Sequence, residues 1–210
     1  MNPEVQKESL VVTPPEWEIN FEEYLHRLGI TEHTFRNSIG LAIVGRVKKV
    51  VPLKDVKEIV SMAQIKYRTL ASILRNIKTL DGQSPFRESS FELLKLDPWQ
   101  CQIGQKFAYE ENLLGMFKNL CNVFRNNYFI NPGISTLGAF MIFGLDAQGE
   151  NVLAYYLPPI VEKHQNLVVM DGIHRNWAAL HMGTTICTIV ASSVSVPFPC
   201  SSHNWDELKL

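Results

Sequence analysis

The stretch NLVVMDGIHRNWAALHMG, residues 166–183, constrains the fold more than any other part of this chain. An apolar run stops at Asp171-Gly172, and a segment of helical character, HRNWAALHMG, follows without a linker. The next stretch, TTICTIVASSV (184–194), is rich in β-branched residues, which favour strands. A strand, a helix and a second strand in immediate succession predict a sheet with a helix packed on it.

The chain before this unit predicts further strands and another helix. GAFMIFGLDAQGENVLAYYLPPIV (138–161) surrounds the turn-forming segment 146–149 and predicts a β-hairpin. FELLKLDPWQ (91–100) predicts a short strand that runs into a turn, and AYEENLLGMFKNLCNVFRNN (108–127) predicts an amphipathic helix. The pattern therefore predicts the α+β class for residues 81–210.

The first part of the chain has a different character. Residues 1–20 show little periodicity and are expected to form an extended arm. A helix is expected to begin after Asn20, because Glu23 follows three residues later in the pattern of a capping box. The apolar positions of residues 53–80 recur at three–four spacing, which predicts the longest helix of the chain.

A polar, turn-rich segment, DGQSPFRESS (81–90), is the expected domain boundary. It divides the chain into an arm (1–20), a basic helical region (21–80) and an α+β domain (81–210). The net charge of −1 is spread unevenly over these parts. The helical region holds eleven Lys/Arg and five Asp/Glu, so +6, whereas the domain after it holds eight and twelve, so −4. The excess of positive charge favours an anionic partner; the alternative is a solvated helical face packed against a mildly acidic domain.

Composition and cysteine usage point to a cytoplasmic globular protein. Apolar residues make up 46% of the 210 positions, and no apolar run reaches the roughly 18 residues that a membrane helix needs. The N-terminal residues do not show the basic start and apolar core of a secretory signal. The four cysteines are scattered without a C-x-x-C pair, so we expect free thiols and no metal site. No membrane partner is expected.

The basic region contains one pattern that suggests nucleic acid binding. In YLHRLGITEHTFRNSIG (24–40), a helix that ends in Leu-Gly is followed by Thr31 as the cap of the next helix, as in a helix-turn-helix. Arg27 and Arg36 would then face phosphates, and residues 33–37 would face bases. Helix–Gly–helix corners also occur in ordinary domains, so both interpretations remain.

The joint at residues 171–175 carries the groups of a phosphate pocket. Gly172 permits a tight turn, and the helix that follows presents N–H groups without partners within the helix. Arg175 adds a guanidinium suited to phosphate oxygens, and His174 adds a second donor. Asp171 is suited to holding Mg²⁺, orienting His174 or accepting a proton from a substrate hydroxyl. The alternative is a plain Asp-Gly turn followed by an exposed His-Arg pair.

The segment around this joint resembles the ParB/sulfiredoxin superfamily. The shared elements are Pro159-Ile160, Gly172-Ile173-His174-Arg175, Ala178-Ala179, Gly183 and the strand 186–190. Asp97-Pro98-x-Gln100 is a partial echo of the family's Asn-Pro-x-Gln-Pro-Arg box, whose second proline and arginine are replaced here by Cys101 and Gln102. The resemblance spans about residues 93–194 and implies a mixed-sheet, nucleotide-binding domain after the helical N-terminal region.

The Asp-Gly-x-His-Arg form is nearest to the free-serine kinases of this superfamily. By that resemblance Gly172, His174, Arg175 and Asn176 bind the nucleotide, and Asp171 is catalytic. The implied activity is transfer of phosphate from ATP or ADP, with Mg²⁺, to a small hydroxyl substrate. Ile173 occupies the position of the sulfiredoxin nucleophile, so sulfinic acid reduction is not expected. The alternatives are a nucleotide-responsive DNA-binding regulator that uses residues 21–80 and a non-catalytic interaction module.

Overall fold

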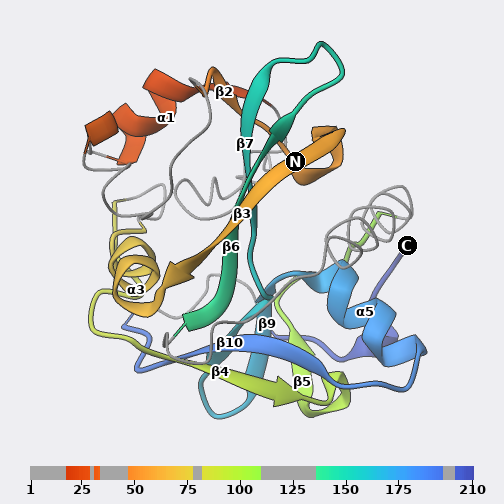
Figure 1. Ribbon diagram of the computed structural model, residues 1–210. Coiled ribbons are helices and arrows are strands. Elements are labelled where there is room, and N and C mark those ends of the chain that lie inside the picture. Colours follow the sequence, from red (N-terminus) through yellow and green to blue (C-terminus); the bar gives the residue numbers. More distant parts are fainter. Residues whose placement is uncertain (1–17, 29–30, 34–46, 78–81, 110–135, 196–201) are drawn as a thin grey trace, which may run out of the picture.

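Over the residues that the structure describes, the protein is an α+β structure with two mixed five-stranded sheets and a small number of helices (Figure 1). The computed structural model describes residues 18–28, 31–33, 47–77, 82–109, 136–195 and 202–210. Most of the predicted arm, most of the predicted helix at 108–127 and most of the segment 31–44 lie outside these ranges. Within them, no helix is long and apolar enough to cross a membrane.

The first sheet has the order β1-β2-β7-β6-β3. Its strands are β1 (Ile19–Asn20), β2 (Lys49–Val50), β3 (Glu58–Lys66), β6 (Thr136–Leu145) and β7 (Asn151–Tyr156). Only the β2–β7 pair is parallel. The hairpin predicted at 138–161 is confirmed, because β6 and β7 pair antiparallel around Asp146, whose Oδ1 accepts hydrogen bonds from Gln148 N and Glu150 N.

The second sheet has the order β4-β10-β8-β9-β5 and contains the strand–helix–strand unit. Its strands are β4 (Ser90–Leu96), β5 (Cys101–Ile103), β8 (Ile160–Lys163), β9 (Leu167–Asp171) and β10 (Ile186–Ser192). The helix α5 (Ile173–His181) joins β9 to β10, as the sequence predicts. The expected strand at 91–100 is also confirmed, since β4 is followed by the 3₁₀ turn η2 (Pro98–Gln100).

The predicted helix over residues 53–80 is wrong in its first half. Residues 58–66 form β3, a strand paired with β6, and the helix α3 (Tyr67–Arg75) begins only after Lys66, whose φ of −61° and ψ of 143° are extended. The apolar residues of this stretch are also compatible with a strand whose two faces are both partly covered. Pairing with the long strand β6 then favours the strand over the helix. The short 3₁₀ helix η1 (Leu53–Asp55) precedes β3.

The helix α1 (Phe21–Leu28) begins where the sequence predicts. Asn20 Oδ1 accepts a hydrogen bond from Glu22 N at 2.8 Å and lies 3.5 Å from Glu23 N, which caps the first turn. The acidic residues of this turn also suit the positive end of the helix dipole.

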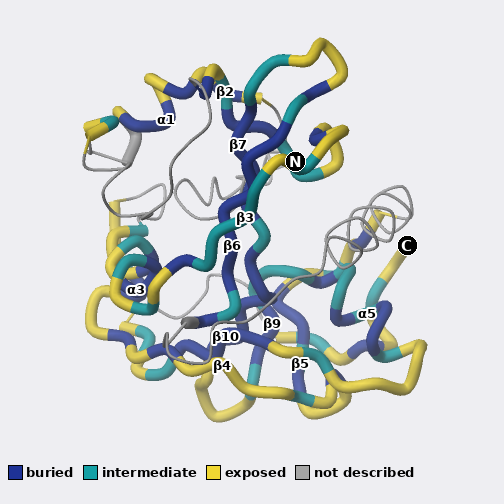
Figure 2. Tube along the Cα trace, in the orientation of Figure 1, coloured by how far each residue is buried: buried dark blue, intermediate teal, exposed yellow. Residues whose placement is uncertain are grey.

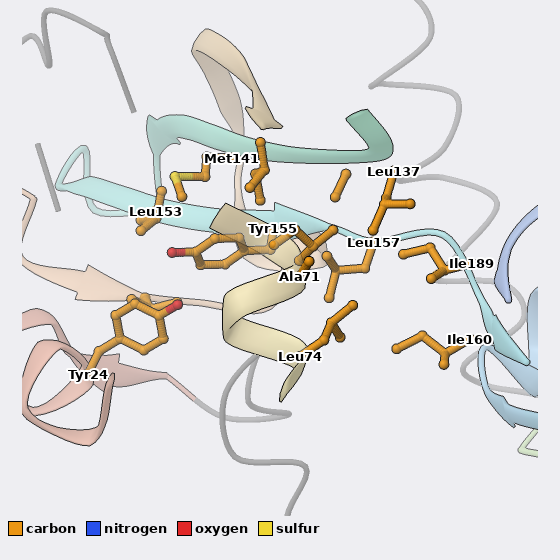
Figure 3. Close-up of a cluster of buried hydrophobic side chains, with 14 of the residues drawn as sticks. Tyr24, Ala71, Leu74, Leu137, Met141, Leu153, Tyr155, Leu157, Ile160 and Ile189 are labelled. Atoms are coloured by element: carbon orange, nitrogen blue, oxygen red, sulfur yellow. The ribbon is translucent and has the colours of Figure 1, made fainter. Parts of the chain in front are cut away.

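One buried apolar cluster joins the two sheets to α1 and α3. It includes Tyr24 from α1, Leu74 from α3, Tyr155 from β7, and Ile160 and Ile189 from the second sheet (Figure 3). Dark buried segments accordingly run through the centre of both sheets in Figure 2. The segment 81–90 therefore does not separate the strands of the first sheet, which come from both sides of it.

The opposite face of the second sheet is covered by α5 and by the C-terminal segment. Val161, Val169, Ile173 and Ile103 form a second cluster there together with Trp205 of the 3₁₀ turn η3 (Trp205–Glu207). The indole Nε1 of Trp205 donates a hydrogen bond to Pro98 O at 2.9 Å. The chain end is thus packed against the element that carries the candidate site.

Candidate functional site at the start of α5

The turn between β9 and α5 requires a glycine. Gly172 has φ 79° and ψ 32°, the left-handed conformation that side chains disfavour. A Cβ at this position would lie 2.9 Å from Arg175 Nη2 and 2.9 Å from Pro159 Cβ. The glycine therefore allows the backbone to approach both β8 and the guanidinium of the first helical turn.

Asn176 holds this turn closed and is not exposed to a ligand. Its backbone N–H and its side-chain Nδ2 both donate to Gly172 O, at 3.0 and 3.1 Å. The residue is only 1% exposed. The sequence predicts that Asn176 binds the nucleotide directly. In the structure its buried amide hydrogen-bonds the backbone, so we assign it the role of holding the turn in shape.

Arg175 connects the helix to both neighbouring strands. Its Nη1 donates to Leu157 O, its Nη2 lies 3.4 Å from Asp171 Oδ2, and its Cζ lies 5.7 Å from the centre of the Tyr156 ring. The side chain is 17% exposed. Arg175 therefore links the end of β7 to the β9–α5 turn. An anion bound at the helix start would interact with a guanidinium that already contacts Leu157, Asp171 and Tyr156.

His174 has a defined orientation at the helix start. Its Nε2 accepts a hydrogen bond from Tyr109 N at 2.9 Å, so this nitrogen carries no proton while the bond is present. In this tautomer of the neutral imidazole the proton is on Nδ1. Tyr109 follows β5 and is 67% exposed, so the imidazole links α5 to an exposed part of the chain.

Asp171 is the acidic group of the site. It ends β9, its side chain is 34% exposed, and its partner Arg175 follows one helical turn later. No group of three or more His, Cys, Asp or Glu side chains that could hold a metal occurs among the described residues. One carboxylate fits Mg²⁺ when the remaining ligands are phosphate oxygens and water.

The partial echo of the Asn-Pro box lies beside α5 and supports it. Asp97 Oδ1 accepts a hydrogen bond from Trp99 N at 3.0 Å, which starts η2, and Pro98 is buried under Trp205. Burial raises the pKa of the Cys101 thiol to about 11, with a smaller contribution from the negative charge of Asp97. Cys101 is therefore a packing residue and not a nucleophile.

A second pair of ionisable groups was not found from the sequence. Glu162 on β8 is 2% exposed, and its Oε2 lies 2.7 Å from His164 Nε2. A glutamate inside the apolar run PPIVEK was the only signal. This pair lies at the far end of β8 from Pro159, so it is separate from the α5 site.

The predicted nucleic acid region is described only in part. α1 contains Arg27, whereas Arg36 and residues 34–37 lie outside the described ranges. The helix-turn-helix therefore stays a prediction.

Comparisons of the chain with protein-family models, with curated proteins and with solved structures give no match.

Proposed function

We propose that this protein binds the phosphate groups of a nucleotide at the start of α5. One observation carries the proposal: α5 begins at a left-handed glycine, and a histidine and an arginine lie in its first turn behind an acidic strand end. The first-turn N–H groups have no partners within the helix and lie at the positive end of its dipole. Such a helix start favours phosphate oxygens.

The contacts around the turn suggest separate roles for its residues. The first-turn N–H groups bind the phosphate, and His174 Nδ1 adds a donor. Arg175 balances the charge of Asp171 and holds it near the helix start, at 3.4 Å. Asn176 fixes the carbonyl of Gly172 and with it the direction of the first turn.

The activity that fits these groups is phosphate transfer from ATP or ADP to a small hydroxyl substrate. The substrate oxygen attacks the terminal phosphorus, the bond to the bridging oxygen of the nucleotide breaks, and the hydroxyl proton passes to Asp171. Mg²⁺ bound to the phosphate oxygens would supply charge neutralisation. The supporting observation is that the Asp171 side chain is one-third exposed and lies at the start of α5, 3.4 Å from Arg175.

Calorimetric titration with ATP and ADP, with and without Mg²⁺, tests the binding proposal. We expect His174→Ala to weaken nucleotide binding by roughly tenfold, the loss of one hydrogen bond to a charged group. The matched control is His181→Ala, which removes the imidazole from the last turn of the same helix. No heat with any nucleotide, or equal losses in the two variants, would count against a site at the helix start.

Asp171→Asn tests the catalytic part separately, because it keeps the shape of the side chain. We expect nucleotide binding to persist and turnover with hydroxyl compounds to fall by about a hundredfold or more. Binding without turnover in the unaltered chain would leave a nucleotide switch, and unchanged turnover in the variant would remove Asp171 as the base.

A further inference from the structure

The C-terminal segment, residues 202–210, is hydrogen-bonded at two places to the chain that follows β5. Ile103 and His203 exchange both backbone hydrogen bonds, each at 2.9 Å. Further along, Lys209 N donates to Lys106 O at 2.7 Å, and Lys209 O accepts from Ala108 N at 2.9 Å. Two separate pairings therefore hold residues 103–108 against the C-terminal segment.

Side chains anchor the C-terminal segment between these two pairings. Trp205 is buried in the cluster below α5. Glu207 Oε2 lies 2.9 Å from Lys106 Nζ, and Lys209 Nζ lies 5.9 Å from the centre of the Phe107 ring. The Lys106–Glu207 pair is about 40% exposed on both sides and adds little energy by itself. The backbone bonds and Trp205 therefore hold the segment in place.

The residue after the paired stretch contacts the candidate site directly. Ala108 N is bonded to Lys209 O, and the next amide, Tyr109 N, donates to His174 Nε2 at 2.9 Å. Because peptide groups are planar, only the two backbone dihedral angles of Ala108 separate these N–H groups. Ala108 is 2% exposed, so its packed position fixes the direction of the Tyr109 N–H.

We propose that the C-terminal segment positions His174 for the phosphate site, with Lys209 as the positioning residue that acts through its backbone bonds. An imidazole nitrogen that accepts a hydrogen bond carries no proton, so the bond from Tyr109 selects the tautomer with the proton on Nδ1. The inference rests on the proposed function, in which this tautomer donates to phosphate. Release of the segment is therefore expected to weaken phosphate binding.

NMR of the ¹⁵N-labelled full chain reads the tautomer without any nucleotide, at about pH 8, where an imidazole of ordinary pKa is neutral. The signals of His174 are assigned by their loss in His174→Ala, and we expect Nε2 of the unaltered chain to carry no proton. Lys209→Pro removes the donor to Lys106 O. The preceding Leu208, with φ of −69° and ψ of 131°, already has the conformation that a following proline requires.

We expect Lys209→Pro to give a mixture of both tautomers and to weaken ATP binding by about three- to tenfold in calorimetry, the loss of one oriented hydrogen bond. Lys209→Ala removes the ammonium over Phe107 and keeps both backbone bonds, so Nε2 should stay unprotonated. Tyr109→Pro removes the donor itself and should give the same mixture as Lys209→Pro. The indole N–H signal of Trp205 checks in each variant that the rest of the segment stays in place.

The inference fails if Nε2 of the unaltered chain carries the proton. It also fails if Tyr109→Pro changes the tautomer and Lys209→Pro does not, because the bond to the imidazole then forms without help from the C-terminal segment. A change as large in Lys209→Ala would overturn the role of the backbone bonds. If no nucleotide binds the unaltered chain, the proposed function fails, whereas the tautomer comparison still decides whether the segment positions His174.

Discussion

At the scale of single residues, a comparison of Gly172 with Gly183 distinguishes the cost of a left-handed backbone conformation from the cost of steric crowding. Gly172 and Gly183 both adopt left-handed conformations, with φ of 79° and 61°. A Cβ at Gly172 would contact Arg175 and Pro159 at 2.9 Å, whereas a Cβ at Gly183 would meet nothing within 4 Å. We expect Gly183→Ala to cost about 1 kcal/mol of unfolding free energy and Gly172→Ala about 1–3 kcal/mol, measured by urea denaturation.

The difference in unfolding free energy between these two variants measures the cost of placing a methyl group against Arg175 and Pro159. Gly172→Ala should also weaken nucleotide binding, because the added methyl displaces the guanidinium beside Asp171. Equal stability losses would mean that the turn relaxes freely and that the glycine serves the backbone conformation alone.

Asp146 is expected to contribute stability that depends on pH. The Lys49 ammonium, 2.9 Å from Asp146 Oδ2, together with the N–H groups of Glu150 and Gln148, holds the pKa of this carboxyl below its usual value, against an opposing effect of burial. A lowered pKa in the folded state stabilises the fold above about pH 4, and the contribution is lost as pH falls through the folded value.

We therefore expect Asp146→Asn to lower the unfolding free energy at pH 7 and to reduce its further loss on acidification. Urea denaturation at pH 7 and at pH 3 measures both effects. Asp206→Asn, at an exposed carboxylate of η3, is the control. An unchanged acid dependence in Asp146→Asn would show that the contact with Lys49 does not persist in solution.

At the scale of elements, the sequence pattern predicted the structure correctly where interactions between neighbouring residues determine the conformation. The cap at Asn20, the hairpin turn at Asp146 and the strand–helix–strand unit around Gly172 all rest on contacts between residues close in sequence. β3 was predicted as a helix because its conformation depends on pairing with β6, some eighty residues later. In the candidate site, the sequence placed Gly172 and Asp171 correctly at the turn. It could not reveal that Leu157 and Tyr109 engage Arg175 and His174.

The C-terminal segment is a second element that only distant contacts explain. Trp205 in this segment is 8% exposed, and its Nε1 donates a hydrogen bond to Pro98 O, more than a hundred residues earlier in the chain. Trp205→Ala should cost about 3–5 kcal/mol by chemical denaturation, because it leaves a cavity under α5. Trp99→Ala, at a tryptophan that is 69% exposed, is the matched control and should change stability by less than about 0.5 kcal/mol. Similar losses in both variants would show that the segment is not packed as described.

At the scale of the whole molecule, the shared cluster predicts a single cooperative unit. Leu74 of α3 is fully buried in the same cluster as Ile189 of the second sheet. Leu74→Ala should therefore lower the unfolding free energy of both sheets by the same amount, about 2–5 kcal/mol. Amide hydrogen exchange, followed separately in α3 and in β9, measures the two losses. If protection falls in α3 and stays unchanged in β9, the chain divides into independent units near residues 81–90. Equal losses would instead show that packing around α3 stabilises the α5 site. A substitution 97 residues before Asp171 would then destabilise β9, the strand that ends at Asp171.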